Sequence, residues 1–240
     1  MDSNKTLGRF TFYSALSNLL PGVIFLWALP AIGPLRSGIT LGSRLTGNLL
    51  IDLIVFLVLT YVLGLILQFL SELAMEPLLK NIFWKGNFFS NIFLIGAYRL
   101  CTKEELSSHI RFAENNLGFQ KEDLLVLQDP EIITDEAKEK KAIQACRAIY
   151  HSLEAKTEQS LVGKRAHVQS TFYSFFLNLS ASFSVVAAAD LLSIPLKYMP
   201  LKEGTVVLIL VNLALGAVFL TLARERGEQC VRGLFRSRST

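Results

Sequence analysis

Few side chains in this sequence have the type and spacing that catalysis or metal binding requires. The three histidines share no metal-binding spacing, and His151 with Glu154 forms an i, i+3 pair of a kind that usually faces solvent. The sequence contains no phosphate-binding P-loop, no GxGxxG and no GxSxG. We therefore expect no enzyme activity, no metal site and no cofactor. The histidines are His109, His151 and His167.

The three cysteines, Cys101, Cys146 and Cys230, include no CxxC pair. An odd number without short spacing argues against both a disulfide framework and a zinc knuckle. We expect reduced thiols.

Two acidic residues, Asp52 and Asp190, lie inside apolar stretches, where an ionisable group is a candidate functional residue. Each lies about one turn from the outer end of its stretch. Pairing with Arg36, Arg44 or Lys197 in the outer loops is the favoured interpretation, and an ion site is the alternative. No acid lies in the middle of a stretch, which disfavours a transporter built around a central carboxylate.

Polar and small residues recur at helical spacing within the same apolar stretches. Lipid provides no hydrophobic drive between helices, so such rows typically mark faces where helices pack closely. Hydrogen-bonded packing is favoured, and a polar row lining an aqueous path in an oligomer is the alternative. The candidate intramembrane polar or pore residues are Asn18, Asp52, Ser174, Asn178, Ser182, Asp190 and Asn212. Their rows also include Thr60, Gly64, Ser180, Ser184 and Gly216.

The composition indicates that a membrane holds these residues in place. Of 240 residues, 51% are hydrophobic and 18% are charged, whereas an average soluble domain has roughly 25% charged residues. Mean hydropathy is +0.41. We predict an all-α integral membrane protein with four transmembrane helices, because four stretches approach the roughly 20 residues that a span needs. They are Leu16–Leu35, Leu49–Phe69, Phe172–Ile194 and Thr205–Ala223.

A short repeat relates the two halves of the chain. Residues 11–19 recur at 171–179, an offset of 160 residues, with six identities in nine positions. If the repeat is real, it predicts two parallel-repeat hairpins in a four-helix bundle. Asn18 and Asn178 would then lie at similar depth and face other helices, because an unpartnered amide in hydrocarbon is costly. Coincidence in an aromatic and serine-rich composition is the alternative.

The distribution of basic residues predicts the orientation in the membrane. With both termini inside, 20 Lys and Arg lie on the cytoplasmic side and four on the other. We expect both termini in the cytoplasm, in a bacterial inner membrane. The arginines of the basic tail are candidate lipid-headgroup contacts, namely Arg224, Arg226, Arg232, Arg236 and Arg238.

A cytoplasmic helical domain is predicted between the second and third spans. It opens with aromatic residues over 81–100, expected at the membrane interface, with a buried core segment as the alternative. Thr102 to Glu105 then has the capping-box pattern, and Gly118 can end that helix. A second helix follows Thr134 with an apolar row at Ala142, Cys146, Ile149 and Leu153. Thirteen bases balance twelve acids over 80–167, so no nucleic-acid surface is expected.

The predicted organisation has four parts. They are the N-terminal segment with hairpin 1 (1–79), the cytoplasmic interfacial and helical domain (80–167), hairpin 2 (168–223) and the basic cytoplasmic tail (224–240).

This organisation predicts a non-enzymatic multipass membrane protein, because about 85 residues lie inside and almost nothing lies outside. We expect an anchor, signalling or effector module whose helical domain contacts a soluble partner, by loose analogy with bacterial defence or stress systems. We also expect contact with the lipid bilayer and a homo-oligomer. An oligomeric ion channel or small transporter is the alternative.

Overall fold

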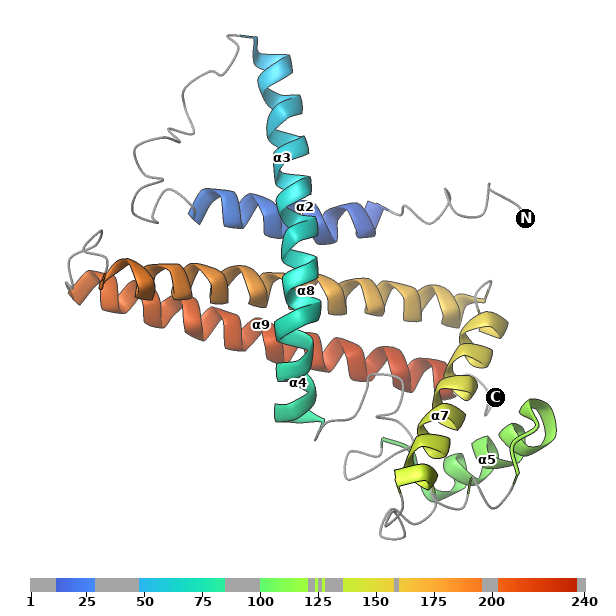
Figure 1. Cartoon of the computed structure of the whole chain (residues 1–240). Helices are drawn as coiled ribbons and strands as arrows, with labels where there is room; N and C mark the ends of the chain where they lie inside the picture. Colours follow the sequence, from blue (N-terminus) through green and yellow to red (C-terminus); the bar gives the residue numbers. More distant parts are fainter. Residues whose placement is uncertain are drawn as a thin grey trace. The chain divides into compact units, whose positions relative to one another are not determined.

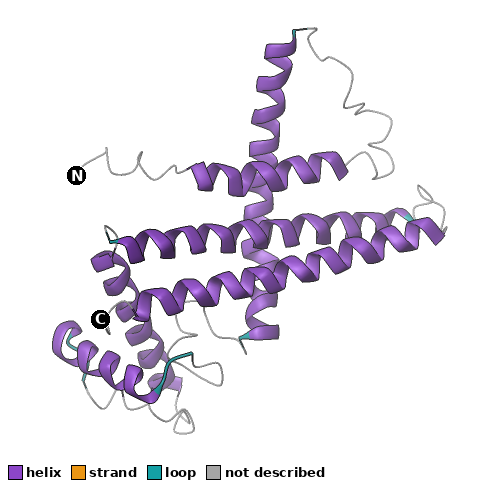
Figure 2. Cartoon of the chain, turned by 180° about the vertical axis from the view of Figure 1, so that it is seen from behind, coloured by secondary structure: helices purple, strands orange, loops and turns teal. Residues whose placement is uncertain are grey.

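The computed structural model is helical over the residues that it describes, and Figure 2 draws no strand among them. The predicted all-helical fold class is confirmed for this part of the chain. The described residues are 12–28, 48–84, 100–120, 124, 127, 136–157, 160–195 and 203–236. The helices labelled in Figure 1 are α2 (Phe12–Ala28), α3 (Leu49–Leu70), α4 (Glu76–Phe83), α5 (Lys103–Leu117), α7 (Glu136–Thr157), α8 (Leu161–Ser193) and α9 (Glu203–Arg236). A π-helical turn, η3 (Ser71–Met75), joins α3 to α4.

Three helical segments are long and apolar enough to cross a membrane: Leu49–Phe83, Leu161–Leu192 and Glu203–Arg236. They contain the second and fourth predicted spans and the third as far as Leu192. The first predicted span overlaps α2 over residues 16–28; α2 has 17 residues and ends at Ala28. Its remaining residues, 29–35, lie outside the described part of the chain.

The chain packs as two compact units. Unit 1 comprises residues 1–77 and 171–223, and unit 2 comprises 78–170 and 224–240. Helices α8 and α9 each contribute residues to both units, and they run side by side in Figures 1 and 2.

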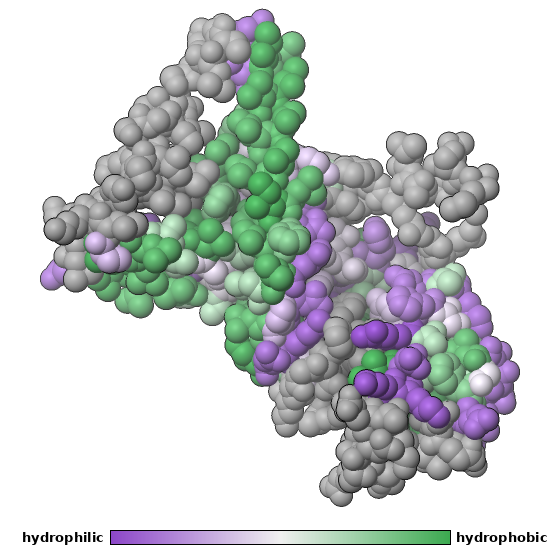
Figure 3. Space-filling model, viewed as in Figure 1, coloured by the Kyte–Doolittle hydropathy of each residue, from purple (hydrophilic) through white to green (hydrophobic). Residues whose placement is uncertain are grey.

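In unit 1, α3 is apolar on every side. Asn48 caps its start, where Oδ1 accepts a hydrogen bond of 3.1 Å from the Leu50 backbone N–H. Strongly exposed apolar side chains follow along its length, from Leu49 at 79% to Phe69 at 64% exposure. Figure 3 shows this continuous apolar surface over α3. An apolar surface all round a helix is typical of a lipid-facing segment or of one buried by a partner.

Helix α5 in unit 2 begins and ends where the sequence predicts. The Thr102 backbone N–H donates to Glu105 Oε2 at 2.8 Å, and the Glu105 backbone N–H donates to Thr102 Oγ1 at 3.2 Å. This reciprocal pair satisfies two donors that the first turn would leave unbonded. Gly118 ends the helix with φ of 73°, a left-handed conformation that glycine adopts without steric cost.

The core of unit 2 is an ordinary hydrophobic core. The predicted apolar row of α7 is buried, and α5, which contacts α7, buries Leu106, Ile110 and Ala113. The end of α9 joins this core: Phe235 is buried and meets the His109 ring edge-on at a centroid distance of 5.0 Å. Each large apolar side chain buried in this way stabilises the unit by about 1.5–3 kcal/mol.

The aromatic segment predicted at the membrane interface is described only over residues 81–84 and at Leu100. Trp84 is fully buried, which fits the alternative of a core segment at this position. Residues 85–99 lie outside the described part of the chain.

Candidate functional site: buried polar contacts between apolar helices

Helices α2 and α3 touch backbone to backbone in unit 1. A Cβ atom at Gly22 would lie 1.8 Å from the Thr60 carbonyl oxygen, and one at Gly64 would lie 2.0 Å from the Asn18 carbonyl oxygen. Only glycine fits at such distances, so Gly22 and Gly64 set how closely the two helices approach. The predicted row containing Thr60 and Gly64 is therefore a helix-packing face.

The side chain of Asn178 on α8 joins this contact to a third segment. Its Nδ2 donates to Asn18 Oδ1 and to the Ser17 carbonyl oxygen, both at 3.3 Å. Its Oδ1 accepts from Ser71 Oγ at 2.7 Å. All four residues are buried, with Asn178 at 1% exposure. The expectation that the two asparagines of the repeat face other helices is confirmed, because they bond to each other.

A second polar contact holds α8 against α9. Ser180 Oγ donates to the Gly216 carbonyl oxygen at 2.8 Å, and it lies 3.6 Å from Met75 Sδ in the π-turn. A Cβ at Gly216 would lie 3.1 Å from Ser184 Oγ, so this approach is also close. Small residues of the predicted rows on α8 and α9 therefore meet.

The other predicted polar residues occupy different surroundings. Ser182 is buried and bonds within its own helix, from Oγ to the Asn178 carbonyl oxygen at 3.0 Å. Ser174 is half-buried, and Asn212 on α9 is buried at 8% exposure.

The two acids of the apolar segments also differ in burial. Asp52 is half-buried in the first turn of α3, where a negative charge interacts favourably with the helix dipole. Asp190 has no exposed surface and lies one turn before the end of α8. Their predicted partners Arg36, Arg44 and Lys197 lie outside the described residues.

Four arginines predicted to contact lipid headgroups make contacts inside unit 2. Arg224 bonds Glu228 at 2.8 Å, and Arg232 lies 3.5 Å from the same carboxylate. Arg236 bonds Glu105 at 3.2 Å. Arg226 donates to the side-chain oxygens of Gln169 and Gln229. Arg238 lies outside the described residues.

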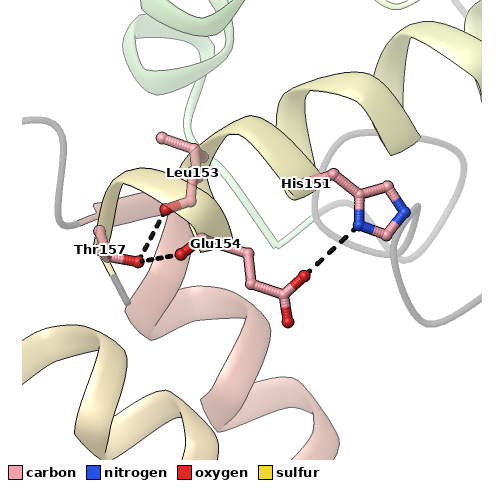
Figure 4. A network of polar contacts seen from close by, with 4 residues as sticks. All are labelled: His151, Leu153, Glu154 and Thr157. Carbon is pink, nitrogen blue, oxygen red and sulfur yellow. Dashed lines mark hydrogen bonds and ion pairs between the residues drawn. The ribbon is translucent and has the colours of Figure 1, made fainter. Parts of the chain in front are cut away.

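The side chains suited to nucleophilic or metal chemistry do not converge where the chain is described. No group of three or more His, Cys, Asp or Glu residues there could hold a metal ion. Burial raises the pKa of the Cys146 thiol, which keeps it protonated and unreactive. The predicted His151–Glu154 pair forms, with Nδ1 and Oε2 3.4 Å apart, but both side chains are more than half exposed (Figure 4).

Sequence reasoning did not single out Ser17, Gly22, Ser71 or Met75. Gly22 lies four residues after Asn18, so it continues the row of that asparagine. Ser71 and Met75 continue the row that begins at Thr60 and Gly64. Extending the Asn18 row by one helical turn would have found Gly22, and following the Gly64 row to the end of the helix would have found Ser71 and Met75, whereas Ser17 lies on neither row.

Comparison with protein-family models, curated proteins and solved structures finds no match for this chain. The described residues therefore define a class by architecture alone: an all-helical protein with three segments able to cross a membrane and polar contacts buried between them.

A glycine series tests the close approach of α2 and α3. Gly64→Ala should lower the free energy of unfolding by about 1–3 kcal/mol, because the new methyl group must displace the α2 backbone. Gly204→Ala is the matched control, since nothing lies within 4 Å of a Cβ there. Thermal unfolding in detergent measures both, and equal stability of the two variants would contradict this packing.

A pair of substitutions on α8 tests the role of the Asn178 amide. Asn178→Ala should destabilise the protein by about 1–3 kcal/mol, because it removes contacts with two other segments and leaves their polar groups without this partner. Ser182→Ala removes an equally buried group that bonds only within α8, and it should cost less than about 1 kcal/mol. Chemical unfolding in detergent gives both values. A Ser182 effect as large as that of Asn178 would show that contacts between helices do not depend on this amide.

Proposed function

We propose that this chain is a non-enzymatic multipass membrane protein that serves as an anchor, signalling or effector module. Its apolar helices lie in the lipid bilayer, and its charged helical unit contacts a soluble cytoplasmic partner, as in bacterial defence or stress systems. The observation that carries the proposal is the contrast between α3, which exposes apolar side chains along its length, and unit 2, which buries its own core.

Lipid accounts for the exposed surface of α3. Twelve large apolar side chains from Leu49 to Phe69 are exposed. Removing such surface from water gains about 25 cal/mol per Å². A bilayer provides that gain along the whole helix, and a homo-oligomer adds further burial.

The proposal includes α2 as a fourth span. Its 17 residues extend roughly 25 Å at 1.5 Å per residue, somewhat less than the roughly 30 Å of hydrocarbon. A few further residues beyond Ala28, or local thinning of the bilayer, would complete the crossing. Four spans place both termini and unit 2 on the cytoplasmic side, which the distribution of basic residues favours.

The hydrogen bonds within unit 1 favour an anchor or signalling bundle over a channel. Asn18, Asn178 and Ser180 use their polar atoms on neighbouring helices, and such groups line an aqueous path only when they face it. Beside them, a hollow of about 30 Å³ is lined by Leu16, Ser17 and three residues of α8.

An oligomeric ion channel or small transporter is the second candidate, and the rows of polar residues in the sequence are the observation in its favour.

Single-cysteine labelling in intact cells tests the four-span topology. Cysteines placed at Gly38 and Met199 should react with impermeant maleimide, and cysteines at Asp129 and after Thr240 should react only once the membrane is opened. The expectation follows from the larger number of Lys and Arg residues on the side predicted to be cytoplasmic. Each variant carries Ser at the three native cysteines, with that background as the control. Labelling at Asp129 from outside would contradict the topology.

Ion flux in liposomes separates the anchor from the channel. The purified protein should give no flux above protein-free liposomes, and Asp52→Asn and Asp190→Asn should leave that baseline unchanged. In a channel, by contrast, an acid near the mouth concentrates cations, so its neutralisation changes selectivity. Cation flux that either substitution alters, with the oligomer intact, would favour the channel.

A further inference from the structure

We propose that Lys164, Arg165 and Gln169 on α8 bind the phosphate of an anionic phospholipid, with Leu161 and Val168 contacting its apolar part. The inference rests on the proposed function, because it requires α8 to enter a bilayer. It assigns the lipid contact to residues other than the arginines at the end of α9.

These five side chains line one open hollow of about 270 Å³. Their spacing of i, i+3, i+4, i+7 and i+8 places them along one face of α8. Lys164 and Arg165 are exposed, and Leu161 is 76% exposed, whereas Val168 and Gln169 are half-buried. The hollow therefore combines two cations with apolar contacts, which matches a lipid better than a free ion.

The described acids of α8 and of the neighbouring turns of α9 do not pair with the two cations of this hollow. Along α8, no acid occurs before Asp190. On α9, Glu228 pairs with Arg224 and Arg232, and Glu225 accepts a hydrogen bond from Gln229 at 3.0 Å. Among the described residues, neither Lys164 nor Arg165 takes part in an ion pair.

Gln169 adds a fixed neutral donor. Its Oε1 accepts from Arg226 Nη1 at 3.4 Å, which orients the amide. Its NH₂ group keeps donors for a further acceptor such as a phosphate oxygen. An ammonium, a guanidinium and an amide then surround one anionic group.

The place of these residues along α8 suits a headgroup. The predicted span begins at Phe172, seven residues after Arg165 and thus roughly 10 Å along the helix. The headgroup layer begins just beyond the hydrocarbon, and long basic side chains reach it while their stems stay on apolar surface.

Lipid binding to the purified full chain tests the site. The protein in a neutral detergent is titrated with phosphatidylglycerol or phosphatidylcholine and observed by native mass spectrometry. We expect a preference for phosphatidylglycerol, which K164Q/R165Q weakens by roughly fivefold or more per charge removed. The matched control K140Q/K141Q removes two exposed lysines of α7 in the same unit and should leave the preference intact. K164R/R165K keeps both charges and should also retain it.

Each remaining outcome overturns the inference. Equal weakening by K164Q/R165Q and K140Q/K141Q would mean that only net charge matters. Equal binding of phosphatidylcholine would mean that the hollow takes apolar chains alone. Displacement of phosphatidylglycerol by millimolar inorganic phosphate would identify free phosphate as the ligand. Carbonate extraction of cell membranes tests the proposed function separately: a chain that stays in the membrane without lipid preference loses only this site, and a chain that is released loses both.

Discussion

The amide of Asn178 has to be satisfied inside an apolar environment, and the packing of unit 1 follows from that requirement. Hydrocarbon offers no hydrogen-bond partner, so each buried polar group must find one within the protein. Asn178 reaches Asn18 on α2, whose backbone touches α3 at Gly64, and Ser71 in the π-helical turn. Glycines at the crossing allow that contact, because any side chain there would separate the helices and pull the polar partners apart.

A π-helical turn lies where α3 passes into α4. Each residue advances a helix by about 100°, so a π-helical turn, which adds a residue to one turn, shifts the faces of α4 relative to those of α3. Ser71 at its start meets Asn178, and Met75 at its end meets Ser180. These two residues are four positions apart, so they share one face, and that face contacts α8.

Two different sources of stability operate in the two units. Unit 2 follows the rules of a water-soluble core: α5 and α7 bury apolar rows, α5 is capped at both ends, and charged residues such as Lys140 are exposed. Unit 1 reverses that pattern, since apolar side chains of α3 are exposed while polar ones are buried. The anchor that we propose, with its helical unit in the cytoplasm, would account for both patterns.

The sequence by itself determined the properties that depend on neighbours along the chain. Apolar length located α3, α8 and α9, the Thr102–Glu105 pair fixed the start of α5, and the repeat singled out Asn18 and Asn178. Each is a local signal, because helix formation, capping and the face a residue occupies depend on residues within a few turns. Only the tertiary structure decided which faces meet. That Gly22 lies against Thr60, that Ser71 bonds Asn178 and that Arg236 pairs with Glu105 depends on where the helices cross. Helical periodicity fixes the face of a residue but leaves its partner open, since many pairs of polar faces satisfy the same spacing.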